Sequence, residues 1–294
     1  MTATTLDTSA PQRTRAARPS AKLNWGSPVV YFVALCFIAL MISPVIYLIV
    51  GGFRSNSQIT VDPSGWPNPW RIENYTTVLS NPAFWRAFMN STIAAVVTTA
   101  GVVALGLAAS FAIARYRFRG SGALYTLFAA GLMFPMTVAI TPLYILIRGL
   151  HLMNKLGGVI LPGIAFALPV TVIILVPFLR AIPYEIQEAA EIDGCGRFGF
   201  FFRMVVPLSV PGVITVGILA FIGSWNGYML PLYILNNPDS QTLPLTVQTF
   251  ASGPYSTDTA LILAFTSLAM LPALGFFSLF ERRIVGGLTG AVKG

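Results

Sequence analysis

Six long apolar runs restrict the folds that this chain can adopt. Each run has about 20 residues or more, the length that an α-helix needs to cross the hydrocarbon core of a bilayer. Because backbone N–H and C=O groups in lipid must be paired within the segment, such runs favour helices over open sheets. The sequence therefore predicts an all-α membrane protein with six transmembrane helices. The runs lie at residues 29–52, 90–114, 122–147, 158–179, 211–234 and 260–280.

Composition supports one membrane domain with short polar ends. The chain is 55% apolar and 10% charged, whereas soluble domains contain about 25% charged residues. We expect a disordered cytoplasmic tail at residues 1–24, because Thr, Ala, Ser, Pro and basic residues dominate it. The six-helix domain is then predicted at residues 25–281, followed by a cytoplasmic tail at residues 282–294.

The first apolar run has a signal peptide as an alternative interpretation, because Arg13, Arg15, Arg18 and Lys22 precede it. The run is longer than the apolar core of a signal peptide, and it lacks a small-x-small cleavage site. We therefore interpret residues 29–52 as an uncleaved first span.

The distribution of Lys and Arg predicts the orientation. The N-terminal tail contains four, and the loops at 115–121 and 180–208 and the C-terminal tail contain three each, against five on all other loops. Because cytoplasmic loops carry an excess of Lys and Arg, both termini and the 181–208 loop are predicted to face the cytoplasm. The net charge of +8 then reflects membrane topology, and no nucleic-acid partner is expected.

The six runs contain no Asp, Glu, Lys, Arg or His. Ionisable groups inside a membrane usually mark proton relays or charged substrates, so their absence indicates a neutral solute. The chain also lacks the G-x-x-x-x-G-K-[ST] phosphate loop, which means that energy for transport would come from a partner. Sodium coupling through carbonyls and hydroxyls remains open, because such sites need no charged side chain.

A polar segment at residues 181–208 interrupts these runs, and we interpret it as a docking element for another protein. Pro183 suits the first turn of a short helix, since its missing N–H would be unpaired there. Asp193-Gly194 suits the end of that helix, because glycine accepts the left-handed conformation. On this helix the small residues Ala189 and Ala190 would let another protein approach the backbone closely.

A second short helix is predicted after Gly194. Apolar residues recur there at i, i+3, i+4 and i+7, which predicts a single apolar stripe. The stripe consists of Phe198, Phe201, Phe202 and Val205.

The same segment resembles the permeases of bacterial ABC importers. Their motif is E-A-A, three residues, Gly, nine residues, Ile, any residue, Leu-Pro, and the spacing here matches throughout. Met204 and Val206 replace Ile and Leu, and both exchanges are apolar. The residues of the expected type are Glu188, Ala189, Ala190, Gly194 and Pro207.

This resemblance implies the ABC importer permease fold, with the 181–208 loop as a coupling helix that sits in a cleft of a separate ATPase subunit. The implied coupling residues are Glu188, Ala189, Ala190, Asp193, Gly194 and Pro207. The glycine-rich C-terminus is similar to tails that reach into the ATPase pair, which implies contacts by Gly286, Gly287 and Thr289; a frayed terminus is the alternative.

The family also implies the partners of the chain. They are a second, homologous permease, two ATPase subunits and an extracytoplasmic sugar-binding protein, in a bacterial cytoplasmic (inner) membrane. ATP and Mg²⁺ would be used by the ATPases, and this chain would bind no cofactor or metal and would not be an enzyme. Its own serine and histidine residues support no hydrolase, because the only histidine, His151, falls in a predicted outer loop.

Residues 224–228, Ser-Trp-Asn-Gly-Tyr, with Thr242-Leu243-Pro244-Leu245 further on, look like the carbohydrate-uptake branch of these permeases, specifically its smaller permease subunit. Gly227 stands where that branch commonly has an acid. Trp225, Asn226 and Tyr228 supply aromatic and polar groups that suit a sugar path near a helix distortion between Gly223 and Pro231. Packing against neighbouring helices is the alternative for these residues.

Transport of a di- or oligosaccharide is the function that these features favour. An ABC permease for another neutral solute, such as a polyol, and a stand-alone secondary transporter are the alternatives.

Several other residues carry structural expectations. Cys36 and Cys195 are predicted to be unpaired thiols. A small-residue face in the second run suits close helix packing. Residues 53–89 carry aromatics that suit a headgroup interface. The small residues are Gly101, Ala104, Gly106, Ala108 and Ala109, and the aromatics are Trp66, Trp70, Tyr75, Phe84 and Trp85.

Overall fold

The computed structural model describes residues 28–252, 254, 255 and 257–292, and these residues form helices joined by turns, with no β-strand among them. The all-α class predicted from the sequence is confirmed. The chain divides into two compact units, Met1–Pro44 and Val45–Gly294. The predicted tail at residues 1–24 lies outside the described residues.

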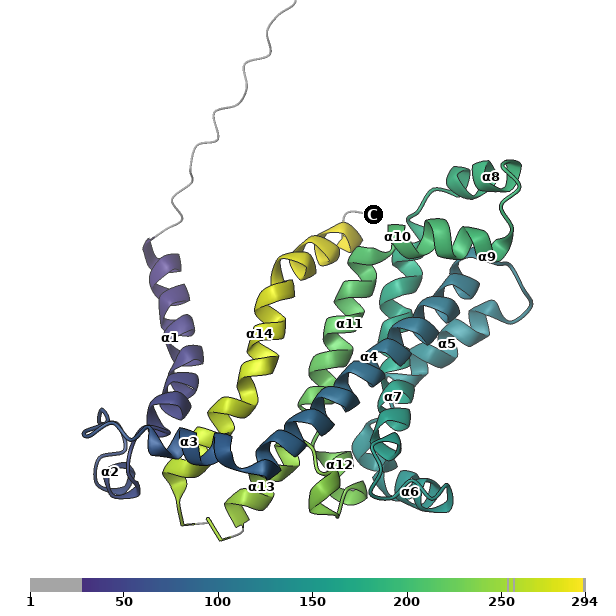
Figure 1. Ribbon diagram of the computed structural model, residues 1–294. Helices are drawn as coiled ribbons and strands as arrows, with labels where there is room; N and C mark the ends of the chain where they lie inside the picture. The colour runs from purple at the N-terminus through teal and green to yellow at the C-terminus, as the bar shows by residue number, and fades with distance from the viewer. Residues whose placement is uncertain (1–27, 253, 256, 293–294) are drawn as a thin grey trace, which may run out of the picture. The chain divides into compact units, whose positions relative to one another are not determined.

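Figure 1 labels the helices in chain order. The first seven are α1 (Pro28–Gly51), α2 (Asn56–Val61), α3 (Glu73–Ser80), α4 (Pro82–Arg115), α5 (Ser121–Gly131), α6 (Met136–Gly149) and α7 (Gly157–Arg180). The polar loop forms α8 (Tyr184–Ile192), α9 (Arg197–Phe200), a π-helical turn (Phe201–Val205) and α10 (Val206–Leu208). The remainder forms α11 (Val210–Trp225), α12 (Met229–Ile234), a 3₁₀ turn (Pro238–Ser240), α13 (Leu243–Ser252) and α14 (Thr259–Val292).

Among the described residues, four helices are long and apolar enough to cross a membrane by themselves: α1, α4, α7 and the first part of α14, Thr259–Ser278. Two bent pairs of helices reach the required length only together. They are α5 with α6, bent by 101°, and Arg197–Leu208 with α11, bent by 75°. The number of spans is therefore four, or up to six if each bent pair counts as one, which is consistent with the predicted six. The C-terminal tail predicted at 282–294 continues α14 as far as Val292.

The third apolar run, 122–147, is not one straight helix. It consists of α5 and α6, which are bent by 101° at a break before Met136. Pro135 is the N-cap of α6, with φ −74° and ψ 135°. A proline disfavours helical geometry in the residue before it, so α5 ends before this position and α6 starts in a new direction.

The fifth run, 211–234, is also interrupted. α11 ends at Trp225 and α12 begins at Met229. Pro231 has no N–H, so it cannot donate to the carbonyl of Gly227 four residues earlier, and a continuous helix would leave that carbonyl unpaired. The predicted distortion between Gly223 and Pro231 is confirmed as this break.

Close packing of α4 against α7 forms the centre of the Val45–Gly294 unit. A Cβ atom on Gly106 would overlap Thr171 Cγ2 of α7, and one on Gly101 would overlap the end of Ile164. Gly101 and Gly106 of the predicted small-residue face therefore let these two helices approach closely, whereas Ala104 and Ala108 of that face are exposed.

The aromatic residues at positions 53–89, which reach into the first turn of α4, divide into exposed and buried ones. Trp66, Trp70 and Trp85 are exposed, as expected for a headgroup interface. Phe84 is buried against Phe265 of α14, and Tyr75 donates to Ile49 O at 2.7 Å while accepting from Ser267 Oγ at 2.9 Å. The interface prediction is therefore wrong for Phe84, and for the half-buried Tyr75 it stays a prediction. Burial raises the pKa of Tyr75, and the hydrogen bond with Ser267 opposes this change with a smaller effect.

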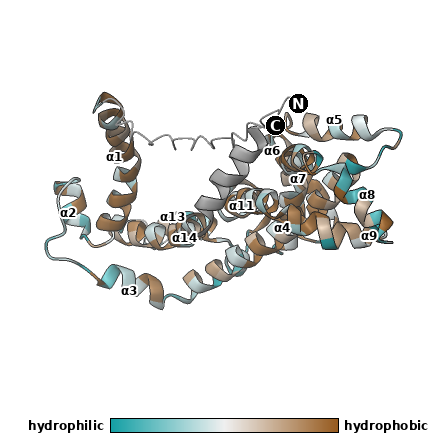
Figure 2. Cartoon of the chain, turned by 90° about the horizontal axis from the view of Figure 1, so that it is seen from above, coloured by the Kyte–Doolittle hydropathy of each residue, from teal (hydrophilic) through white to brown (hydrophobic). Residues whose placement is uncertain are grey.

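The Val45–Gly294 unit has different chemistry at its two ends. Figure 1 shows α8, α9 and α10 at one end of the long helices and α6, α12 and α13 at the other. In Figure 2 the long helices are mainly hydrophobic, whereas α8 carries hydrophilic residues. The α8 end is a candidate docking surface, and the α6–α12 end is a candidate solute site.

Candidate functional site

The polar loop begins with α8, which projects its carboxylates into solvent. Pro183 is the N-cap residue of α8, so the helix begins one residue later than the first turn predicted for this proline. The carboxylates of α8 and its C-cap are all exposed, and they are Glu185, Glu188, Glu191 and Asp193. Such a surface is available to a second protein.

Gly194 ends α8 in the way that the sequence predicts. Its φ is +77°, and its N–H donates to Glu191 O at 3.0 Å while the N–H of Cys195 donates to Ala190 O at 2.8 Å. These two bonds form a Schellman motif, which pairs carbonyls that a helix end would otherwise leave free. The positive φ explains why glycine occupies this position.

The two alanines of α8 face in different directions. Ala189 is exposed, whereas Ala190 is only 4% exposed and packs into a core cluster with Phe111, Leu179 and Phe200. Only Ala189 is therefore open to another protein, and Ala190 instead lets α8 lie close to its own protein. Pro207, further along the loop, is exposed.

The apolar stripe predicted for the second short helix is only partly confirmed: Val205 is buried and Phe201 packs against the core, whereas Phe198 and Phe202 are exposed. Phe200 and Val205 are buried, whereas Phe198 is 82% exposed and Phe202 is 66% exposed. The reason is the π-helical turn at Phe201–Val205, in which the N–H of Val206 donates to Phe201 O five residues back. In an i→i+5 turn the residue below Phe200 is Val205, so a pattern based on the α-helical period assigns the wrong face.

A cavity of about 280 Å³ lies at the α6–α12 end of the same unit. The two helix breaks face it: Met136 and Thr137 begin α6, and Gly227 and Tyr228 form the break before α12. Irregular backbone at membrane depth is tolerated where it lines a cavity, which accounts for the position of both breaks. The remaining lining residues are Ala94, Val159, Gly163, Gly223, Ser224, Met229, Leu230, Pro231 and Thr242.

A second hollow of about 370 Å³ shares Thr137 and Met229 with this cavity. Tyr144 and Tyr233 add phenol groups, and Thr141 adds a hydroxyl. Neither hollow has an Asp, Glu, Lys, Arg or His among its described lining residues. The pair thus offers aromatic faces and hydroxyl groups without charge.

The three residues predicted for a solute path are separated by the structure. Trp225 is 3% exposed, stacks near Phe221 and donates from Nε1 to Ala269 O at 3.3 Å, so it packs between helices. Asn226 is exposed at the end of α11 but does not line the cavity. Tyr228 lines it, and its hydroxyl is 2.6 Å from Gln248 Oε1. Sequence reasoning missed Thr137 and Ser224, because a single hydroxyl in an apolar run carries no pattern.

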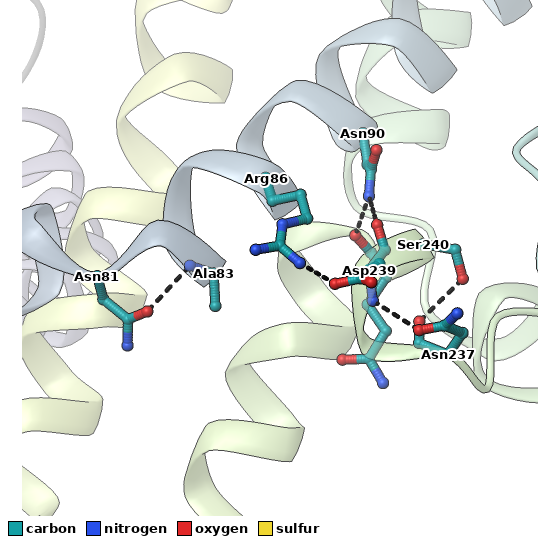
Figure 3. A network of polar contacts seen from close by, with 8 residues as sticks. Asn81, Ala83, Arg86, Asn90, Asn237, Asp239 and Ser240 are labelled. Atoms are coloured by element: carbon teal, nitrogen blue, oxygen red, sulfur yellow. Dashed lines mark hydrogen bonds and ion pairs between the residues drawn. The ribbon is translucent and has the colours of Figure 1, made fainter.

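A polar network holds the loop after α12 against the beginning of α4 (Figure 3). Asn90 donates from Nδ2 to Asp239 O at 3.0 Å and to Gln241 O at 2.9 Å, and Arg86 forms an ion pair with Asp239. The backbone N–H of Leu243 donates to Ser91 Oγ at 2.8 Å. Because the ion pair is exposed, the amide contacts of Asn90 contribute more to this attachment. The network positions Thr242 on the cavity wall.

Other residues singled out in the sequence have structural positions. Cys36 and Cys195 are free, as predicted. His151 is exposed in the turn after α6, where its φ is +57°. Gly286, Gly287 and Thr289 lie in the last part of α14, and their side chains are outside the described part of the chain. No group of three His, Cys, Asp or Glu side chains among the described residues could hold a metal ion.

Several membrane helices, a polar loop at one end and an uncharged cavity at the other define a multi-pass transport protein. Residues 103–286 match the family described as binding-protein-dependent transport system inner membrane component. This chain belongs to that family, which consists of transport components and not of enzymes.

Several permeases named for the sugar or glycoside that they transport align with most of this chain. The diacetylchitobiose uptake system permease protein of Streptomyces coelicolor is 33% identical over 85% of this chain and 83% of its own length. The sulfoquinovosyl glycerol transport system permease protein of Agrobacterium fabrum is 32% identical over 92% and 95%. The trehalose transport system permease protein of Mycobacterium tuberculosis is 36% identical over 78% and 84%. The predicted resemblance to carbohydrate-uptake permeases is confirmed.

A solved structure supports the fold. A chain of a bacterial ABC transporter involved in the import of the acidic polysaccharide alginate aligns with a TM-score of 0.71 at 20% identity, covering 86% of this chain and 95% of that chain. At this identity the likeness supports the permease fold alone.

The left-handed conformation of Gly194 leads to a first prediction. Nothing lies within 4 Å of a Cβ built on this residue, so any cost of substitution comes from the backbone. We expect Gly194→Val to destabilise the end of α8 by about 1–2 kcal/mol, because non-glycine residues, and β-branched ones above all, are disfavoured at positive φ. Gly194→Asn is the matched control, since asparagine visits this conformation more readily. Limited proteolysis of the purified chain should cut the loop faster in the valine variant only, and equal rates would contradict the prediction.

Proposed function

We propose that this chain is the transmembrane permease subunit of an ATP-driven importer for a neutral carbohydrate of two or more sugar units. Membership of the binding-protein-dependent family and the names of its relatives support this proposal. The observation that carries it is the uncharged pair of hollows beside the two helix breaks. Sugars expose C–H faces that pack on aromatic rings and hydroxyls that need donors and acceptors, and the hollows offer both kinds of group.

The chain would work in a complex with a second, homologous permease, two ATPase subunits and an extracytoplasmic sugar-binding protein. The ATPases would bind ATP and Mg²⁺, because this sequence has no phosphate loop of its own. Closure of the ATPases would displace α8, and the helices would then open the solute path alternately to the two sides of the membrane.

In this proposal α8 is the element that docks on an ATPase. Glu188, Ala189 and Asp193 are exposed on it, and Gly194 ends it sharply. Ala190 supports the helix from within, and Pro207 marks the return to the long helices. The C-terminal residues Gly286, Gly287 and Thr289 are proposed to contact the ATPase pair as well.

A docking test uses the two exposed ends of the same unit. Ala189→Trp places a large side chain where close approach is needed, so we expect binding of the ATPase subunits to weaken at least tenfold, or by ~1.4 kcal/mol. Gly149→Trp is the matched control, because Gly149 is exposed at the end of α6 and a Cβ there meets nothing within 4 Å. Co-purification of ATPase subunits with a tag on this chain measures the effect, and retention by the Ala189 variant would remove the docking role.

A second test addresses orientation, which we propose from the Lys and Arg distribution: both termini and α8 are cytoplasmic. In a background with Cys36→Ser and Cys195→Ala, single cysteines replace the exposed residues Arg119 and Asn236. A membrane-impermeant maleimide should label Asn236→Cys in spheroplasts and label Arg119→Cys only after lysis. The reverse pattern would invert the proposed topology.

A third test fills the cavity. Gly223 lines it, and a Cβ at this position meets nothing within 4 Å, so Gly223→Leu should occupy the cavity without displacing the protein. The names of relatives suggest trehalose, diacetylchitobiose and, from a Bacillus subtilis permease that is 30% identical, arabino-oligosaccharides as trial sugars. We expect uptake of whichever of these the wild-type complex imports to fall by about fivefold or more. Such a loss corresponds to ~1 kcal/mol.

Gly275→Leu is the control for this test, because Gly275 is exposed in α14 with equally open space around its Cα. Equal uptake by the Gly223 and Gly275 variants, at equal amounts of assembled complex, would exclude the cavity from the solute path. Import of a polyol in place of all three sugars would instead correct the substrate class.

A further inference from the structure

Arg115 joins α4 to the docking loop from a buried position. It is the last residue of α4, and it is only 5% exposed. Its Nη2 donates to Ile182 O at 2.8 Å, and its Cζ lies 5.0 Å from the ring centroid of Tyr184, the first residue of α8. One side chain thus holds both the linker into α8 and the beginning of that helix.

The guanidinium group makes far fewer hydrogen bonds than it can donate. Nε and Nη1 are buried and have no hydrogen-bond partner. In the described part of the chain no carboxylate lies within ion-pair distance of Arg115, and the carboxylates of α8 point into solvent. A buried cation without a counter-charge and with free donors is costly, and natural proteins seldom retain one without a reason.

A buried acceptor that lacks a hydrogen-bond donor lies on the same helix as Tyr184. Gln187 follows Tyr184 by three residues, which places both on one face of α8. Gln187 Oε1 is buried and unpaired, while its Nε2 donates to Glu191 at 3.1 Å. The structure therefore has free donors at the end of α4 and a free acceptor on α8, three residues after the tyrosine that Arg115 contacts.

Two other arginines at this end pack on tyrosines without sharing this property. Arg180 lies over Tyr125, with 5.8 Å from its Cζ to the ring centroid, and Arg197 lies over Tyr116 at 5.3 Å. Both arginines are exposed, so water satisfies their remaining donors. Arg115 is distinguished from them by burial and not by its aromatic partner.

We propose that Arg115 is a positioning residue for energy coupling, whose free N–H groups donate to Gln187 Oε1 when α8 is displaced during the transport cycle. This proposal rests on the proposed docking role of α8. In the present conformation both groups are unsatisfied, so the displaced conformation gains a charge-assisted hydrogen bond that this one lacks. A junction with two arrangements of this kind lets a small movement of α8 shift the position of α4, which lines the solute cavity at Ala94.

The test is a double-mutant cycle on the complex, purified through a tag on this chain and reconstituted in proteoliposomes with its binding protein. Arg115→Lys keeps the charge but loses the planar fork of donors. Gln187→Met keeps the length of the side chain but removes Oε1. The measured quantity is the amount of trehalose or diacetylchitobiose imported per ATP hydrolysed, using whichever sugar the wild-type complex imports.

We expect each single variant to lower this ratio by about fivefold or more, and the double variant to be no worse than the poorer single one. Arg180→Met is the control and should leave the ratio unchanged. If the two losses multiply, or if Gln187→Met alone has the wild-type ratio, the proposal is wrong even where Arg115→Lys fails to assemble. If the wild-type complex imports no sugar at all, the proposed function fails first and independently of Arg115.

Discussion

The need to pair every backbone polar group in a low-dielectric environment governs this structure. Long helices satisfy the need internally, and a proline that interrupts a helix leaves a carbonyl without its donor. Pro135 and Pro231 cause two such interruptions, and residues beside both of them line the same cavity. These two breaks of the described chain thus lie in one region, where a cavity gives free backbone groups room for polar partners. The interrupted helices and the proposed neutral solute path would then have one physical cause.

The opposite end of the same unit combines a firmly held loop with an exposed surface, as the proposed docking of α8 on an ATPase requires. Rigidity comes from the Schellman motif at Gly194, from Ala190 packed into the core and from the π-helical turn that buries Phe200 and Val205. Exposure comes from the carboxylates of α8 and from Phe198 and Phe202. Arg115 connects this loop to a membrane helix, because it is the last residue of α4 and donates to the carbonyl of Ile182.

Local rules predicted the features that depend on neighbouring residues in the chain. Gly194 as the end of α8 follows from backbone geometry within a few residues and is confirmed, and Pro183 marks the beginning of α8 to within one residue. The break near Pro231 follows from the absence of one N–H. Patterns that assume a regular period failed at the stripe beginning with Phe198, since one π turn shifts the face that is buried. Composition failed for Trp225 and Phe84, because an aromatic ring suits a solute, a headgroup interface and a core equally well.

The sequence by itself determined the membrane class, the apolar segments, the family and the ends of the docking helix, because hydropathy, spacing and backbone conformation are local properties. Tertiary structure alone decided which residues face the cavity, which alanine of α8 is exposed and where Arg115 places its free donors. These outcomes depend on residues that are far apart in the chain, such as Arg115 and Ile182 or Trp225 and Ala269. Local sequence patterns do not predict such contacts, because the contacts form only when α4, α7, α11 and α14 pack together and exclude solvent between them.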